Sequence, residues 1–289
     1  MKMNLCRTVL ILFILFTASE AFAESSVWVA SSHKAKVYLA GSFHMLRNSD
    51  YPLPDEFFTA YKDSRKIIFE APIGDESSMA NLLGLAIYTD GTTLKDHISK
   101  AAYARAESFC KERNYPIKQF EFFKPSMFVM TLTILEMTRI GADPQKGIDH
   151  FFKERTLEDG KTTESLETID EQINLLASIN ENVGSDQILE SIGEFKQIES
   201  MLEESLAVWK KGNEPEMERL FIKEMKNYPQ LYKSIIIDRN NKWMTKINGY
   251  LNNTANTMVI VGAAHLVGPD GLVNLLRKKG YKVVQLQKQ

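Results

Sequence analysis

Two apolar segments, far apart in the chain, end in the same four-residue pattern, Gly-x-x-His. Residues 37–40 run into Gly41-Ser42-Phe43-His44, and residues 258–261 run into Gly262-Ala263-Ala264-His265. Short apolar runs bounded by polar residues are typical of buried strands, and glycine lets the chain turn sharply at a strand end. The chain has only five histidines among its 289 residues. We therefore expect both motifs to lie at the carboxyl edge of one sheet, where open α/β sheets bind ligands.

Each motif belongs to a strand–helix–strand unit. In residues 37–71 the helix begins near Pro54-Asp55, and the second strand is Ile67-Ile68-Phe69. In residues 257–286 a short amphipathic helix ends at Gly280, before the last strand. Successive elements of this kind predict parallel strands joined by a crossover.

The interval between the two units is predicted to be mostly helical, because its apolar residues recur near the helical period. The predicted helical stretches are 82–88, 101–113, 125–139, 188–209, 214–225 and 231–251. Residues 162–169 are a candidate short strand. The sequence thus predicts an α/β fold with a core formed by 24–73 and 256–289 around a helical insertion at 74–255.

The first 23 residues have the pattern of a secretory signal peptide. Lys2 and Arg7 precede the apolar run 9–16, and Ala21-Phe22-Ala23 places small residues where a signal peptidase cleaves. The run is shorter than the ~20 residues of a membrane-spanning helix, so an uncleaved anchor is the weaker alternative. We expect cleavage after Ala23 and export to the periplasm or the medium. Cleavage would remove Cys6, leaving one cysteine and no intramolecular disulfide.

The overall charge limits the classes of partner. The chain has 35 basic and 37 acidic residues, a formal net charge of -2. This balance argues against a general nucleic-acid or anionic-membrane binder. We expect a peptide or small-molecule substrate, no nucleic acid, and no stable membrane insertion after signal cleavage. A homodimer is compatible with apolar helix faces in the insertion.

Glu70 has the same placement as the two histidines, because it directly follows the predicted strand 67–69. A carboxylate there is costly to desolvate unless it is paired or bound to a metal. With His44 and His265 it would form a facial ligand set for divalent zinc, manganese, iron or cobalt. Such an ion acidifies bound water and polarises a carbonyl, which is hydrolase chemistry. The alternatives are an exposed strand-end acid and histidines that merely pack near turns.

The surrounding residues resemble the signatures of the TraB/GumN family. The N-terminal signature is matched by Gly41-Ser42-Phe43-His44, Tyr51-Pro52-Leu53-Pro54 and Phe69-Glu70, and the C-terminal one by residues 261–268 with Gly271-Leu272. Between them, similar positions follow in the family's order: Lys124-Pro125, Gly147-Ile148-Asp149, Leu166-Glu167, Arg239-Asn240 and Trp243. The resemblance covers essentially all of the chain that follows the first 23 residues.

This resemblance implies a relation to the Tiki proteins, metal-dependent proteases that use paired Gly-x-x-His motifs and a glutamate with manganese or cobalt. It implies metal-binding and catalytic roles for His44, Glu70 and His265, supported by Gly41 and Gly262. More distant relatives include erythromycin-esterase-like and haem-binding proteins. Three interpretations stay open: a peptidase, a hydrolase of small esters or amides, and a non-catalytic module that binds haem or a peptide.

Three further residues are weaker candidates. Arg239 would clamp a carboxylate or stabilise an oxyanion, although a helix-surface arginine has the same sequence signal. Asp149, or its neighbour His150, would support a ligating imidazole, or else lie in the first turn of a helix where an acid favours the dipole. Lys124 either belongs to the site or marks the start of a helix. Glu70 is alternatively the general base, with water or another side chain as the third ligand.

Overall fold

A computed structural model describes residues 24–73, 84–180 and 183–288. The predicted signal peptide, residues 1–23, lies outside the described residues, and export stays a prediction. Within the described ranges, no helix combines the length and the apolar character needed to cross a bilayer.

The centre of the fold is a mixed sheet of six strands in the order β4-β3-β5-β2-β1-β6. The strands are β1 (Glu24–Ser31), β2 (Lys36–Ser42), β3 (Lys66–Phe69), β4 (Thr162–Ser165), β5 (Thr257–Gly262) and β6 (Lys282–Gln287). The four strands β4, β3, β5 and β2 are parallel neighbours, whereas β1 runs antiparallel to both β2 and β6. The predicted α/β class is confirmed.

The order of the strands decides how the motifs meet. The pattern of residues 37–71 suggests that β2 and β3 form a pair, but β5 lies between them and pairs with both. Residues 257–261 of β5 are all buried apolar or threonine side chains, which suits a central strand covered on both faces. The carboxyl ends of β2 and β3 therefore lie on either side of the carboxyl end of β5.

Twelve α-helices are named in the described part of the chain. They are α2 (Asp55–Asp63), α4 (Leu94–His97), α5 (Lys100–Arg113), α6 (Pro125–Arg139), α7 (Ile148–Glu158), α8 (Ile169–Asn180), α9 (Ser185–Glu194), α10 (Ile198–Lys211), α11 (Glu214–Phe221), α12 (Pro229–Tyr232), α13 (Arg239–Leu251) and α14 (Leu272–Lys278). A π-helical turn, Lys233–Asp238, joins α12 to α13. Such turns are frequent at functional sites, and Arg239 directly follows this one.

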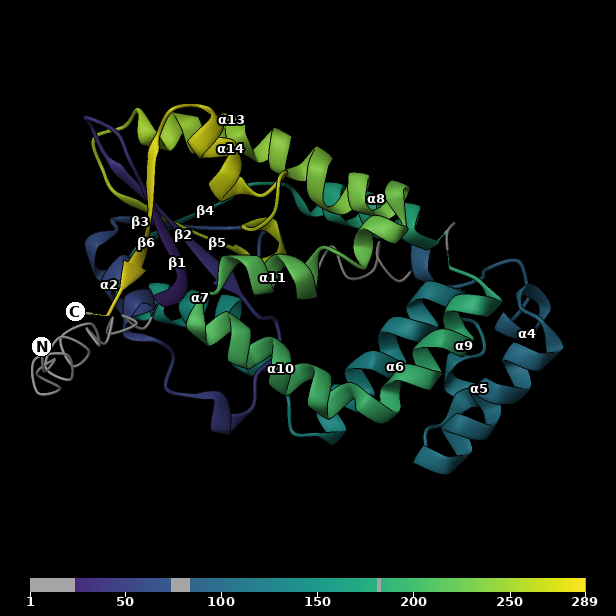
Figure 1. Cartoon of the computed structure of the whole chain (residues 1–289). Helices are drawn as coiled ribbons and strands as arrows, with labels where there is room; N and C mark the ends of the chain where they lie inside the picture. The colour runs from purple at the N-terminus through teal and green to yellow at the C-terminus, as the bar shows by residue number, and fades with distance from the viewer. Residues whose placement is uncertain (1–23, 74–83, 181–182, 289) are drawn as a thin grey trace, which may run out of the picture.

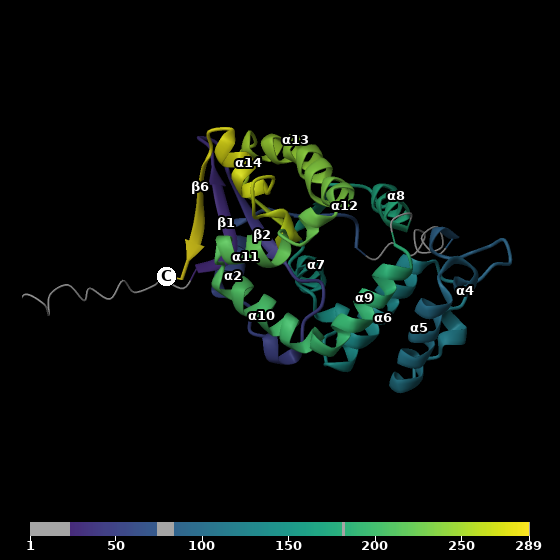
Figure 2. The same cartoon turned by 45° about the vertical axis from the view of Figure 1, so that its right-hand side comes forward.

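The sheet is covered on both faces (Figures 1 and 2). Helices α13 and α14 lie on one face. On the other, Phe57 of α2 packs against Phe152 of α7 and Trp209 of α10. The Trp209 Nε1–H donates to the Gly41 carbonyl oxygen at 2.8 Å. Helix α10 is thereby fixed to the strand that leads to the first Gly-x-x-His motif.

Segment 74–255 contributes to the sheet as well as to the helices. Its strand β4, at the position suggested by the sequence, pairs with β3 at one edge. Helices α7, α10 and α13 also pack into the main core. A second hydrophobic cluster, made by residues between 94 and 195, contains parts of α5, α6 and α9. It lies toward the end of the molecule farthest from β6 (Figures 1 and 2).

The stretch 188–209 forms two helices rather than one. A short 3-10 turn at Phe195–Gln197 separates α9 from α10. Ile188 and Ile192 are buried in the second cluster, whereas Leu206 is buried in the main core. The two halves bury their apolar faces against different cores, so a straight helix would satisfy only one of them.

Candidate functional site

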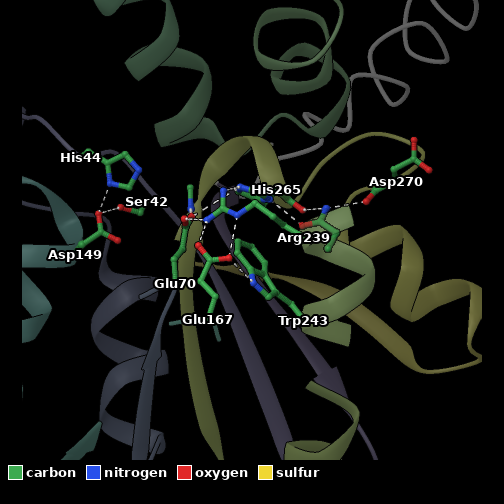
Figure 3. Close-up of polar contacts among 11 residues, drawn as sticks. Ser42, His44, Glu70, Asp149, Glu167, Arg239, Trp243, His265 and Asp270 are labelled. Atoms are coloured by element: carbon green, nitrogen blue, oxygen red, sulfur yellow. Dashed lines mark hydrogen bonds and ion pairs between the residues drawn. The ribbon is translucent and has the colours of Figure 1, made fainter. Parts of the chain in front are cut away.

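The ends of β2, β3 and β5 bring the three candidate ligands together around Gly262. Ser42 is level with Gly262 in the sheet, and Phe69 with Ile260. A Cβ atom built on Gly262 would lie 3.3 Å from Glu70 Oε1, 3.6 Å from His265 Cδ2 and 3.8 Å from His44 Nε2. Glycine thus leaves room for side chains from three strand ends to converge on one backbone position (Figure 3).

Glu70 is buried and fully partnered. Its Oε1 accepts a hydrogen bond from the Gly262 N–H at 2.5 Å, and its Oε2 accepts one from Arg239 Nη2 at 2.6 Å. Burial alone would raise the pKa of this carboxyl, but the electrostatic interactions with His265, Arg239 and His44, together with the hydrogen bond from the Gly262 N–H, lower it to about 2. Glu70 is therefore a carboxylate at physiological pH.

Arg239 lies at the centre of this group. Its guanidinium donates to Glu167 Oε2 at 3.1 Å through Nε and to Glu167 Oε1 at 2.7 Å through Nη2, and Nη1 lies 2.9 Å from His265 Nε2. It also stacks over the Trp243 ring, 4.5 Å from its centroid. The Trp243 Nε1–H donates to Glu167 at 3.1 Å. One arginine therefore connects the ends of β3 and β5 to the loop that follows β4.

His265 is a buried, neutral imidazole. Asn240 Nδ2 donates to the carbonyl oxygens of His265 and Asp270, so Asn240 Oδ1 is left to accept from His265 Nδ1 at 2.8 Å. This fixes the tautomer with the lone pair on Nε2, which faces Arg239. Burial lowers the pKa of His265 to about 4, against the opposing charge of Glu70.

His44 has the opposite electrostatic setting. Its Nδ1–H donates to Asp149 Oδ2 at 2.8 Å, and the Ser42 hydroxyl donates to the same oxygen. The hydrogen bond to Asp149, helped by the charges of Asp149 and Glu70, raises the pKa of His44 to about 9, although partial loss of solvent around the ring opposes this. The side chain is 67% exposed. Its second nitrogen, Nε2, is the atom turned toward Gly262.

The position of His44 depends on the start of α7. The Ile148 N–H donates to the Phe43 carbonyl oxygen at 3.0 Å, so this helix turn contacts the motif directly. A Cβ on Gly147 would lie 2.3 Å from the His44 carbonyl oxygen, and therefore only glycine permits this approach. Asp149 follows in the first helical turn. An aspartate there is favoured by the helix dipole and is also aimed at the imidazole.

The donor set fits a divalent ion chemically, with one obstacle. Both imidazoles direct Nε2 inward and donate Nδ1–H to a side-chain oxygen, an arrangement frequent around metal-binding histidines. However, the Arg239 guanidinium lies between His265 and Glu70. In the described ranges, no group of three His, Cys, Asp or Glu side chains is arranged so that it could hold a metal ion. A metal would require Arg239 to release these two residues.

In the described part of the chain, two of the remaining sequence candidates, Gly41 and Lys124, make no side-chain hydrogen bond or ion pair with the group around Arg239, whereas Glu167 and Asn240 do. Gly41 packs closely against Ala263, and among the described residues no hydrogen bond or ion pair joins the Lys124 side chain to the site. Glu167, which the sequence indicated only through a family resemblance, is the bidentate partner of Arg239. Asn240 fixes the His265 tautomer, and its position one residue after an arginine on a helix carries no signal of that role.

Comparison with known proteins identifies this chain at the level of a family. No curated protein and no solved structure matched the chain. The model of the TraB/PrgY/gumN family matches residues 26–285, a span that includes both Gly-x-x-His ends, Glu70 and Arg239. The protein therefore belongs to the TraB/PrgY/gumN family.

Proposed function

We propose that this protein is an exported, metal-dependent hydrolase that cleaves peptide bonds. The observation that carries the proposal is the convergence of His44 Nε2, Glu70 and His265 on Gly262 from neighbouring strand ends. Two imidazoles and one carboxylate leave coordination positions open for water and substrate. The export part of the proposal depends on the signal-like pattern in residues 1–23.

His44, Glu70 and His265 would hold the ion, and manganese, cobalt, zinc or iron would suit these donors. When bound, such an ion polarises a carbonyl and lowers the pKa of water. The protein's own contribution is orientation: Asp149 holds the His44 ring, and Asn240 holds the His265 ring in the tautomer with a free Nε2. Glu70 is alternatively the base that accepts a proton from the attacking water.

Arg239 has a second role in this proposal. Its two hydrogen bonds to Glu167 compensate the guanidinium charge even after it releases Glu70 and His265. The Nη donors released in this way would then face the space beside the ligands. Donors fixed in that position stabilise the negative charge that develops on a carbonyl oxygen during hydrolysis.

A peptide-hydrolysis assay tests the proposal. The purified protein would be incubated with a peptide mixture, with EDTA or with each candidate metal, and the products identified by mass spectrometry. We expect cleavage that EDTA abolishes and one of the metals restores. His44→Ala, His265→Ala and Glu70→Gln should each reduce the rate by about 100-fold or more, since each removes a ligand or base.

The control is His33→Ala, because His33 is an exposed histidine between β1 and β2. It should cleave at the parent rate. A chelator-sensitive activity that survives in the His44→Ala/His265→Ala variant would place the metal elsewhere and contradict the proposal. Absence of both cleavage and metal binding would favour the alternative of a non-catalytic module that binds haem or a peptide.

A further inference from the structure

Two cavities lie beside the candidate site and share part of their lining. The smaller, about 250 Å³, is bordered by Phe43 and by residues of α6, α9 and α10. The larger, about 750 Å³, lies between α9 and the segment 224–231. Ser191 and Glu194 line both. The two cavities therefore meet at α9, and together they form one groove that reaches Phe43, the residue before His44 in the chain.

The part of the groove next to His44 is mostly apolar. Its lining includes Phe43, Met137, Ile198 and Leu202. Met201, at the same place, is 45% exposed, which is high for a methionine. Flexible methionine side chains adapt to varied apolar ligands, so this part suits an apolar side chain of a bound molecule.

The part farther from His44 is acidic. Glu190, Glu194 and Glu224 line the larger cavity, together with Tyr228. None of the ion pairs found in the described residues includes these three glutamates, and nearby Lys226 is paired instead with Glu218. Partial burial and the charges of Glu190 and Glu224 raise the pKa of Glu194. Glu190 accepts a hydrogen bond from the Tyr228 hydroxyl at 3.3 Å, but in the described part of the chain no basic side chain forms an ion pair with the three carboxylates, which repel one another.

We propose that this groove binds an extended peptide segment with an apolar side chain near His44 and a lysine or arginine in the acidic cavity. The inference rests on the proposed function, because it assigns the substrate class of the same site. A basic side chain would bring the positive charge that the three glutamates lack, and its apolar stem would pack beside Tyr228. The volume of about 750 Å³ lies within the usual range for a ligand pocket.

Binding to metal-free protein tests this inference without requiring catalysis. Fluorescein-labelled ten-residue peptides would share a Phe-Leu centre and differ only in two terminal lysines, glutamines or glutamates, placed at either end. Fluorescence anisotropy in EDTA gives the affinities. In one of the two placements we expect the lysine peptide to bind about tenfold more tightly than the glutamine peptide at low salt, with the preference decreasing as salt is added.

Two variants, each with a matched control, test whether the lysine preference arises in the groove. Glu190→Gln/Glu194→Gln/Glu224→Gln should abolish the preference for lysine, whereas Glu107→Gln/Glu112→Gln/Glu158→Gln, the same charge change at other exposed positions, should retain it. Ser191→Arg should weaken binding of the lysine peptide, because it adds bulk and positive charge where the cavities meet. Ser108→Arg, the same change at an exposed position of α5 outside both cavities, should bind like the parent. Circular dichroism would check that each variant is folded.

Two results would overturn the inference. One is equal affinity for the lysine and glutamine peptides in both placements, and the other is a lysine preference that persists after the Glu190/Glu194/Glu224 substitutions. The outcome is separable from that of the hydrolase proposal. Metal-dependent cleavage without any preference for basic peptides would support the hydrolase and contradict the groove assignment. A lysine preference in a protein that cleaves nothing with any metal would support the groove and contradict the hydrolase.

Discussion

His44 and His265 have the same side chain and opposite protonation preferences, because their partners differ. Asp149 holds a positive charge on His44, whereas burial beside Arg239 keeps His265 neutral. Their Nδ1 atoms are both hydrogen-bonded to side-chain oxygens. The two histidines are thus oriented alike, with Nε2 turned inward at both, but His44 Nε2 carries a proton and His265 Nε2 accepts from Arg239.

The pKa of His44 gives a prediction about pH. In the metal-free protein, NMR titration should find this pKa near 9, and Asp149→Asn should lower it toward the ordinary value. The pKa of His44 in the folded protein lies above that of a histidine in the unfolded chain, which is about 6.5. The His44–Asp149 pair therefore contributes its full stabilisation below pH ~6.5. The contribution disappears as the pH rises through 9. An unchanged pKa in Asp149→Asn would refute the assigned cause.

Gly147 gives a prediction about packing. Gly147→Ala should destabilise the protein by about 1–3 kcal/mol, since the new methyl group would overlap the His44 carbonyl oxygen and force the backbone apart. Gly193→Ala is the matched control. It lies in α9 with open space around it, so alanine should stabilise the helix by about 0.5–1 kcal/mol. Urea unfolding measures both. Equal effects of the two substitutions would contradict the close approach at Gly147.

At the scale of elements, α10 links the helical part to the strand that carries His44. Trp209 is fully buried, and its Nε1–H donates to the Gly41 carbonyl oxygen. Trp209→Phe should lower the free energy of unfolding by about 1–3 kcal/mol, because a buried carbonyl loses a donor. Tyr228→Phe, at a residue that is 45% exposed, should change it little. A Trp209→Phe variant as stable as the parent would contradict the importance of this contact.

Cys110 reports on the second hydrophobic cluster. The thiol lies on α5 and is fully buried, and burial raises its pKa to about 11. Thiol reagents attack the thiolate, so Cys110 should stay unmodified at pH 8 in the folded Cys6→Ser protein and react once guanidinium unfolds it. Mass spectrometry measures the modified fraction. Rapid modification of the folded protein would mean that α5 does not pack as described.

The helices show which structural features the periodicity of apolar residues predicts and which it does not. The apolar spacing predicts α5 and α6 closely, because each buries one continuous face. The helix predicted over 231–251 ends where α13 ends, but α13 begins only at Arg239, after a π-helical turn. The spacing also misses the turn at Phe195–Gln197, because the pattern shows that a face is buried but not which core buries it.

At the scale of the whole molecule, the sequence predicted that the ends of three strands meet at one edge of the sheet, but not the order of the strands. The repeated motif and Glu70 could be found from local patterns. The insertion of β5 between β2 and β3 depends on pairing between residues far apart in the chain, because Thr257 pairs with Val37 on one side and with Lys66 on the other. The family resemblance pointed to the positions of Glu167 and Asn240, but their contacts with Arg239 and His265 became apparent only in the folded chain.

The central claim is that His44, Glu70 and His265 hold one metal ion, and elemental analysis tests it most directly. The protein would be purified without chelator, incubated with each candidate metal and desalted, beside the His44→Ala/His265→Ala variant. We predict nearly one equivalent of manganese, cobalt, zinc or iron in the parent and none in the variant. Equal metal content in the two proteins, or no metal in either, would contradict the account.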